Sequence, residues 1–122
     1  MRKRNNKKLR ARLKLWLDSE QSGSSFGDGK WHLLQTIEKT ESLRSTCELL
    51  GISYRKAWGD LKKAEQCLDL NLVTRSRGGR AGGQTVLSEQ GKKWIKAYES
   101  FHRDIEGAVK TAYAKHIKGL VK

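Results

Sequence analysis

The stretch LRSTCELLGISYRKAW, residues 43–58, decides the fold. The apolar residues here are spaced to share one side of a helix from about Ser42 to Leu50. Gly51 follows at the position where a helix often ends in a left-handed residue. Ser53 can cap a further helix, Tyr54–Leu68, immediately afterwards. Two helices joined by a tight Gly-Ile-Ser turn predict a helix-turn-helix unit.

A second stretch, LVTRSRGGRAGGQTVL at residues 72–87, has the chemistry of a β-hairpin. Two short runs with β-branched residues flank a tip that is rich in glycine and arginine. A P-loop would need Gly-Lys-Ser/Thr at the start of a helix, and RGG segments that bind RNA are normally repeated. A hairpin directly after a helix-turn-helix instead predicts the wing of a winged helix-turn-helix.

Two elements are expected before the helix-turn-helix. Residues 9–17 alternate apolar and polar side chains with a period of two, which predicts a half-buried strand followed by a turn-rich loop. Apolar residues at three- and four-residue steps then predict a first helix over Lys30–Lys39, capped by Asp28.

A long final helix is expected from Ser88 to about Lys118, spanning roughly 45 Å at about 1.5 Å per residue. Its apolar residues step by four and three, as in the seam of a coiled coil. An apolar seam on a helix longer than the domain can cover predicts a homodimer, although the seam could also pack within the chain. The predicted dimer interface consists of Trp94, Tyr98, Phe101, Ile105, Ala108 and Ala112.

The predicted fold class is therefore mainly α with a small β component. It is a winged helix-turn-helix made of a strand, three helices, a hairpin wing and a long C-terminal helix. Its expected parts are a basic flexible tail (1–8), a DNA-binding domain (9–87) and a dimerisation helix (88–122). A chain of 122 residues suffices for one compact domain.

Charge indicates the kind of partner. The chain has 26 Lys and Arg against 13 Asp and Glu, a formal net charge of +13. A polyanionic partner would offset the self-repulsion of this charge, with nucleic acid the first candidate and an anionic membrane surface the second. The helix-turn-helix and the wing make double-stranded DNA the expected nucleic acid. No apolar run is long enough to span a bilayer, and two cysteines are too few for a disulfide scaffold. We therefore expect a reduced, cytoplasmic protein associated with the nucleoid and not with a membrane.

The expected DNA contacts come from the helix starts, the third helix and the wing. Arg55 or Lys56 could reach guanine edges in the major groove, while the wing follows the backbone or the minor groove. Tyr54 fits either packing or a phosphate contact, and Trp58 is expected in the core. The predicted DNA-binding residues are Ser42, Arg44, Ser53, Tyr54, Arg55, Lys56, Gly59, Asp60, Lys63, Arg75, Arg77, Gly78, Gly79 and Arg80.

Both stretches resemble the N-terminal DNA-binding domain of the molybdate-responsive ModE regulators, a branch of the LysR-type winged helices. The resemblance covers roughly residues 13–112 and implies a homodimer, joined through the long helix, that acts at a pseudo-palindromic site. Two departures stand out: Arg44 replaces a capping Ser or Thr, which moves the expected cap to Ser42, and Gly59 replaces an acidic residue. The matching residues are Gly51, Ile52, Ser53, Tyr54, Arg55, Ala57, Trp58, Leu72, Val73, Arg75, Gly78, Gly79, Arg80, Gly82, Gly83, Leu87, Ser88 and Gly91.

No cofactor, metal or catalytic site is expected. The oxyanion-binding domains of full-length ModE proteins have no counterpart in the chain, so we expect no molybdate site. His32, His102 and His116 are scattered, and Cys47 and Cys67 are expected as small apolar fillers. No nucleophile–base or paired-carboxylate arrangement stands out, so we expect no enzyme.

Two other function classes stay open. The eight basic residues within 1–14 would also suit a nonspecific nucleoid-type or RNA-associated binder. The long helix would also suit a protein-interaction module. A sequence-specific transcription regulator is preferred because helix-turn-helix, wing and seam occur in that order.

Overall fold

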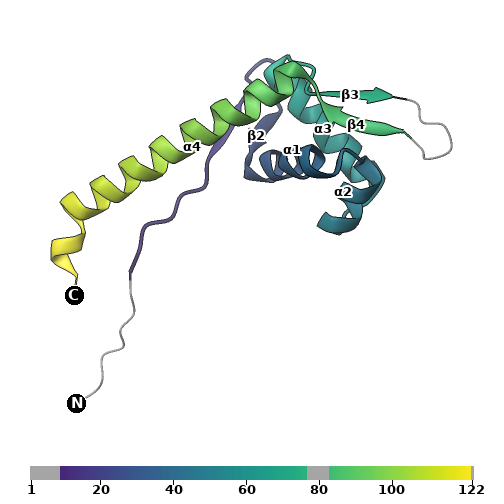
Figure 1. Cartoon of the computed structure of the whole chain (residues 1–122). Coiled ribbons are helices and arrows are strands. Elements are labelled where there is room, and N and C mark those ends of the chain that lie inside the picture. Colours follow the sequence, from purple (N-terminus) through teal and green to yellow (C-terminus); the bar gives the residue numbers. More distant parts are fainter. Residues whose placement is uncertain (1–8, 77–82, 122) are drawn as a thin grey trace.

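The computed structural model describes residues 9–76 and 83–121 (Figure 1). The fold is mainly α with a small antiparallel β component, and it is the winged helix-turn-helix that the sequence predicts. In chain order the elements are β1 (Trp16–Asp18), β2 (Ser25–Gly27), α1 (Asp28–Thr40), α2 (Leu43–Leu50), α3 (Tyr54–Leu68), β3 (Val73–Ser76), β4 (Gln84–Leu87), α4 (Glu89–His116) and a 3-10 turn (Lys118–Leu120).

The helix-turn-helix forms where its local signals place it. The Ser42 hydroxyl accepts a hydrogen bond from the Ser45 amide at 3.0 Å and caps α2, as the replacement at position 44 implied. Gly51 ends α2 with φ +66°, a left-handed conformation that favours glycine. Ser53 caps α3 in the same way as Ser42 caps α2. Each predicted boundary of this unit is confirmed to within a residue.

The core lies between α1, α2, α3, the hairpins and the first turns of α4. Phe26 of β2 is fully buried and meets the rings of Trp94 and Tyr98 edge-on, at centroid distances of 5.2 and 5.0 Å. Such edge-to-face contacts add to the burial of apolar area. The aromatic cluster therefore fixes the start of α4 against the helical domain.

The prediction of a strand over residues 9–17 is wrong in its extent. β1 has three residues, and it pairs antiparallel with β2 from Trp16 opposite Gly27 to Asp18 opposite Ser25. Because α1 begins directly after Gly27, the residues before Trp16 have no strand to pair with. The segment predicted as a turn-rich loop instead contributes β2.

Residues 9–15, here called the N-terminal arm, lie along α4 instead (Figure 1). The Tyr98 hydroxyl lies 3.3 Å from the Leu15 carbonyl oxygen, and the Tyr113 hydroxyl donates to the Leu9 carbonyl at 3.2 Å. The arm thus runs antiparallel to α4.

The first helix begins earlier than predicted. Asp28 is its first residue and not its cap, since Gly27 occupies the cap position without a side-chain hydrogen bond. The Asp28 carboxylate instead accepts a hydrogen bond from the Tyr98 hydroxyl at 3.1 Å and lies 3.5 Å from the His102 imidazole. Asp28 therefore connects α1 with α4.

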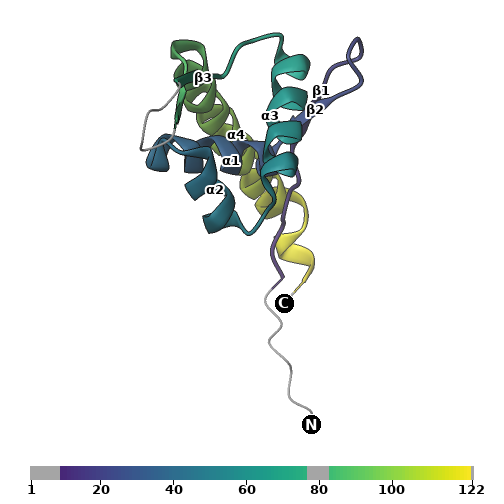
Figure 2. The ribbon, with the colours of Figure 1, turned by 90° about the vertical axis from the view of Figure 1, so that its right-hand side faces the viewer.

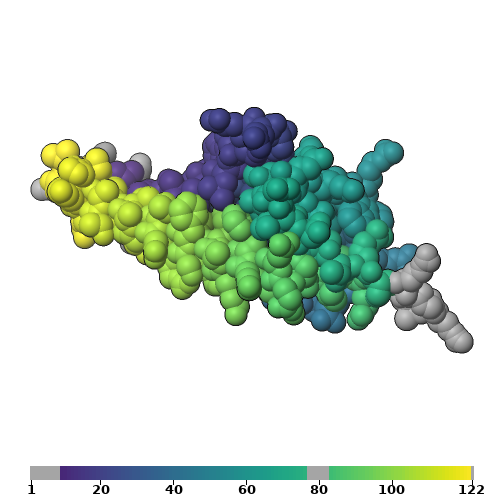
Figure 3. Space-filling model, turned by 90° about the horizontal axis from the view of Figure 1, so that it is seen from above, coloured from purple at the N-terminus to yellow at the C-terminus, as the bar shows by residue number. Residues whose placement is uncertain are grey.

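Only the first turns of α4 pack on the domain, and the rest extends away from it (Figures 1 and 3). The predicted seam is corrected at its start, because Tyr98 is 1% exposed and Trp94 packs against the same core. Further along, Phe101 is 40% exposed, Ile105 is half-buried, and Ala108 and Ala112 are exposed. Of the predicted dimer interface, these four residues are the ones that are not buried in the core of the chain.

Across the described parts of the chain, no helix is both long enough and apolar enough to cross a membrane.

Candidate nucleic-acid interface

The first turn of α3 presents polar and cationic side chains to solvent. Tyr54 is 49% exposed, and Arg55 and Lys56 are exposed beside it. The opposite side of α3 is buried through Ala57 and Leu61. Figure 2 looks onto the face of the molecule that carries α2, α3 and the wing. The turn that reads bases in helix-turn-helix proteins is thus accessible.

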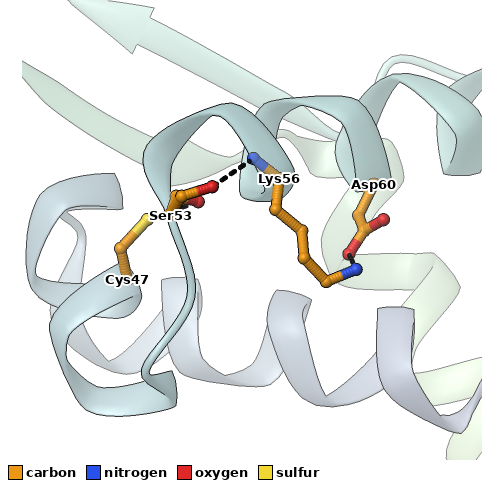
Figure 4. A network of polar contacts seen from close by, with 4 residues as sticks. All are labelled: Cys47, Ser53, Lys56 and Asp60. Atoms are coloured by element: carbon orange, nitrogen blue, oxygen red, sulfur yellow. Dashed lines mark hydrogen bonds and ion pairs between the residues drawn. The ribbon is translucent and has the colours of Figure 1, made fainter.

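A small polar network holds the turn between α2 and α3 (Figure 4). The Cys47 thiol lies 3.7 Å from the Ser53 carbonyl oxygen as a weak donor, and the Ser53 hydroxyl caps α3. One turn further, the Lys56 ammonium pairs with the Asp60 carboxylate at 3.2 Å. None of the ion pairs found in the described residues involves Arg55, so its guanidinium is the first-turn cation left for a ligand.

Two other predicted residues lie along α3. Lys63 is exposed, as a phosphate contact would require. Gly59 is exposed as well, and no heavy atom lies within 4 Å of the position that a Cβ would take. Packing within the protein therefore does not explain this glycine.

A groove of about 610 Å³ separates the helix-turn-helix from the wing. It brings together four of the predicted residues, Ser42, Arg44, Tyr54 and Arg75. Among the described lining residues Glu48 is the one acid, so arginine dominates the charge of the groove. Sequence reasoning missed the remaining lining residues, Cys47, Glu48, Ile52, Ser76, Gly83, Gln84 and Thr85.

The wing strands are held against the end of α1. β3 and β4 are antiparallel, with Arg75 opposite Thr85, and the Thr85 amide donates to the Glu41 carbonyl at 3.2 Å. The predicted tip residues Arg77, Gly78, Gly79 and Arg80 lie outside the described residues. The structure thus describes the stem of the wing, with its side chains.

Arg75 does not extend freely from the wing. Its guanidinium carbon lies 4.2 Å from the centroid of the Trp58 ring, over the face of the indole. Trp58 packs against the core as predicted but is only half-buried. Its ring and that of Tyr54 form a T-shaped pair with centroids 6.5 Å apart. No local sequence pattern predicts this stack, because its partners belong to different elements.

A second basic groove, of about 600 Å³, lies between the N-terminal arm and the distal half of α4. None of the described residues that line it is acidic. They are Leu9, Arg10, Ala11, Arg12, Lys110, Tyr113, Ala114 and Lys118.

The side chains that could serve metal or redox chemistry are dispersed. Within residues 9–76 and 83–121, no three His, Cys, Asp or Glu side chains gather as a metal site requires. Burial raises the pKa of the Cys47 thiol and of the Cys67 thiol, which keeps both protonated at neutral pH. Both belong to the core or its edge, as the small apolar fillers that the sequence predicts.

Comparison with known proteins adds sequence relatives. No protein-family model matches the chain. The molybdenum-pterin-binding protein MopB of Rhodobacter capsulatus is 32% identical over 103 residues, which cover 84% of this chain and 35% of MopB. The DNA-binding transcriptional dual regulator ModE of Escherichia coli K12 is 34% identical over 67 residues, 55% of this chain and 26% of ModE. The molybdenum transport protein ModE of Azotobacter vinelandii is 28% identical over 87 residues, 71% and 32% of the two chains.

The fold has solved counterparts. A mutant of OxyR from Corynebacterium glutamicum with hydrogen peroxide bound superimposes with a TM-score of 0.50 at 20% identity. The match covers 75% of this chain and 27% of OxyR. This chain spans about a third of the length of these two curated relatives, MopB and the A. vinelandii ModE. Over that part it is similar in sequence to the ModE regulators, and its winged helix-turn-helix fold is similar to that of the matching part of OxyR.

Proposed function

We propose that this protein is a homodimeric transcription regulator that binds specific DNA sequences. The observation that carries the proposal is the exposed first turn of α3, with Arg55 unpaired among the described ion pairs, beside a groove dominated by arginine. The E. coli relative is described as a DNA-binding transcriptional regulator. The charge of +13 gives the chain the electrostatic attraction that a DNA-binding protein needs.

In this proposal α3 enters the major groove and Arg55 reads a base edge. A bidentate contact from arginine to guanine discriminates by about 1–3 kcal/mol. Lys56 is a weaker candidate, because Asp60 already neutralises it. The wing and the helix starts hold phosphates and set the register of α3 on the duplex.

Pairing of two chains would take place along α4 from Phe101 onward. Phe101, Ile105, Ala108 and Ala112 supply the shared face, and the exposure of Phe101, Ala108 and Ala112 supports this role. Two copies of α3 would then reach successive turns of the duplex, about 34 Å apart. A dimer of this kind works on chromosomal DNA and would be found with the nucleoid.

The test is selection of bound fragments from genomic DNA, followed by anisotropy titrations of the selected duplex and of an unrelated one. Wild-type protein should prefer the selected duplex by at least about a thousand-fold at physiological salt. Arg55→Ala should lose most of this preference while keeping its affinity for unrelated DNA. Equal losses on both duplexes would show that Arg55 holds phosphate and reads no base.

A nonspecific nucleic-acid binder is the second candidate, and the basic groove at the distal end of α4 favours it. Deleting residues 1–14 separates the two. A regulator keeps its preference for the selected duplex, whereas a nonspecific binder loses most of its affinity for every duplex.

A further inference from the structure

The Trp58 indole lies where α3 and the wing meet. One part of the ring packs against the core, and Arg75 of β3 covers one face at 4.2 Å. Tyr54 meets the ring from the first turn of α3 at 6.5 Å. Three side chains from two elements thus lie in a row, and the outer two, Tyr54 and Arg75, line the groove.

The backbone under Arg75 is held firmly. Arg75 pairs with Thr85 in the stem of the wing, and Thr85 is hydrogen-bonded to Glu41 at the end of α1. The guanidinium is held from the other side by an indole on a core helix. An arginine side chain that would otherwise sample many rotamers is therefore restricted to one region before any ligand arrives.

The stack leaves the binding capacity of the guanidinium free. An aromatic face contacts the π surface of the guanidinium, whereas its N–H donors lie in the plane and point outward. None of the described ion pairs includes Arg75. Arg75 lines the same groove as Arg44 and Tyr54, so the available donors converge on one space.

We propose that Trp58 is a positioning residue that holds Arg75 as a preformed clamp for a DNA backbone phosphate in this groove. The inference rests on the proposed function and deepens it by naming the phosphate contact and the residue that orients it. A planar guanidinium can bind a phosphate through two parallel hydrogen bonds, which a lysine cannot reproduce. A phosphate contact carries no sequence information, so the clamp strengthens binding to every duplex alike.

The test measures affinity and its salt dependence by anisotropy, with one fluorescein-labelled duplex selected from genomic DNA and one of unrelated sequence. Arg75→Gln should weaken binding to both about ten-fold and reduce the slope of log K against log salt by about 1. Trp58→Leu should reproduce both effects although it removes no charge. The double variant should be no weaker than either single variant, because each removes the same contact.

Matched controls separate positioning from folding. Trp58→Phe keeps an aromatic face and should retain most of the affinity. Arg103→Gln removes an equal charge from an exposed site on α4 and should leave the slope unchanged. If Trp58→Leu fails to fold, Arg75→Lys tests the inference instead. It keeps the positive charge but not the planar group that stacks on Trp58, and it should still bind both duplexes more weakly.

Two results overturn the inference while leaving the proposed function intact. They are a normal salt slope for folded Trp58→Leu, and wild-type affinity for Arg75→Lys. A wild-type protein that binds neither duplex overturns the proposed function, and the inference with it.

Discussion

Single glycines show how closely residue identity is tied to packing in this protein. At Gly91, in the first turn of α4, a Cβ would collide with the carbonyl oxygen of Leu72. That oxygen also accepts the Ser88 amide at 2.9 Å, so the two segments are already in contact. Gly59 and Gly107 lie in helices with open space around them. Glycine is thus a steric requirement at one of these positions and not at the other two.

Gly91→Ala should destabilise the fold by about 1–3 kcal/mol, because the backbone must move to admit the methyl group. Gly107→Ala, also in α4, should instead stabilise it by about 0.5–1 kcal/mol. Urea unfolding followed by circular dichroism measures both values. If Gly91→Ala and Gly107→Ala changed the free energy of unfolding by similar amounts, the backbone at Leu72 would move away from the new methyl group at little cost.

Gly59→Ala should raise stability by about 0.5–1 kcal/mol, since alanine fits an exposed helical position better than glycine. We expect the same variant to bind the selected duplex more weakly, because the added methyl group lies on the face proposed to approach DNA. Thermal unfolding and anisotropy on one preparation separate the two effects. A variant that is more stable and binds equally well would place Gly59 outside the DNA contact.

At the scale of elements, the joint between α1 and α4 is built on a buried phenol. Tyr98 donates to Asp28 or to the Leu15 carbonyl, and its ring packs against Trp31 at 5.1 Å. Burial, and then the charge and hydrogen bond of Asp28, raise the pKa of Tyr98 well above its ordinary value of 10.0. The phenol therefore stays protonated and keeps donating across the pH range in which proteins usually work.

Tyr98→Phe should cost about 0.5–1.5 kcal/mol, because it removes the hydrogen bond that the phenol donates to Asp28 or to the Leu15 carbonyl. A pKa raised by folding contributes stability below the unfolded value of about 10 and loses it as the pH rises further. The wild-type advantage over Tyr98→Phe should therefore narrow above pH 10. Urea unfolding of both proteins at neutral and alkaline pH checks this, and a constant difference would contradict it.

The same scale explains what sequence could predict. α2, the turn and α3 follow from capping serines and a glycine, which act within a few residues. The heptad spacing predicted α4 correctly. It did not predict which seam residues are buried within the chain, because Trp94 and Tyr98 pack against Phe26, a residue of another element. The alternation in residues 9–17 resembled a strand, yet a strand requires a partner that the chain does not supply there. The Arg75–Trp58 stack had no sequence signal at all, since it joins two elements.

For the whole molecule, exposed apolar side chains gather in the residues that follow α4. Figure 3 shows the C-terminal residues at the end of the molecule away from α2 and α3. Ile117 and Val121 are 39% and 40% exposed, and Leu120 is 79% exposed. They leave an apolar surface at this end that water solvates poorly. A second copy of the chain is the partner that we propose for it.

Phe101→Glu should convert the proposed dimer to a monomer, because a buried carboxylate without a partner is strongly unfavourable. Ser100→Glu adds the same charge at an exposed neighbouring position and should leave the dimer intact. Sedimentation velocity measures the state of each, and the monomer should bind a two-half-site duplex about 100-fold more weakly. A dimeric Phe101→Glu would move the interface elsewhere.

The N-terminal arm offers a site for a fluorophore that detects association of two chains. The Leu9 carbonyl is bound by Tyr113, on the distal half of α4 and far from the wing. A dye attached through Leu9→Cys should therefore change its emission when two chains associate and stay silent when DNA alone binds. Selective labelling is feasible, because burial raises the thiol pKa of Cys47 and Cys67 and slows their reaction with maleimide.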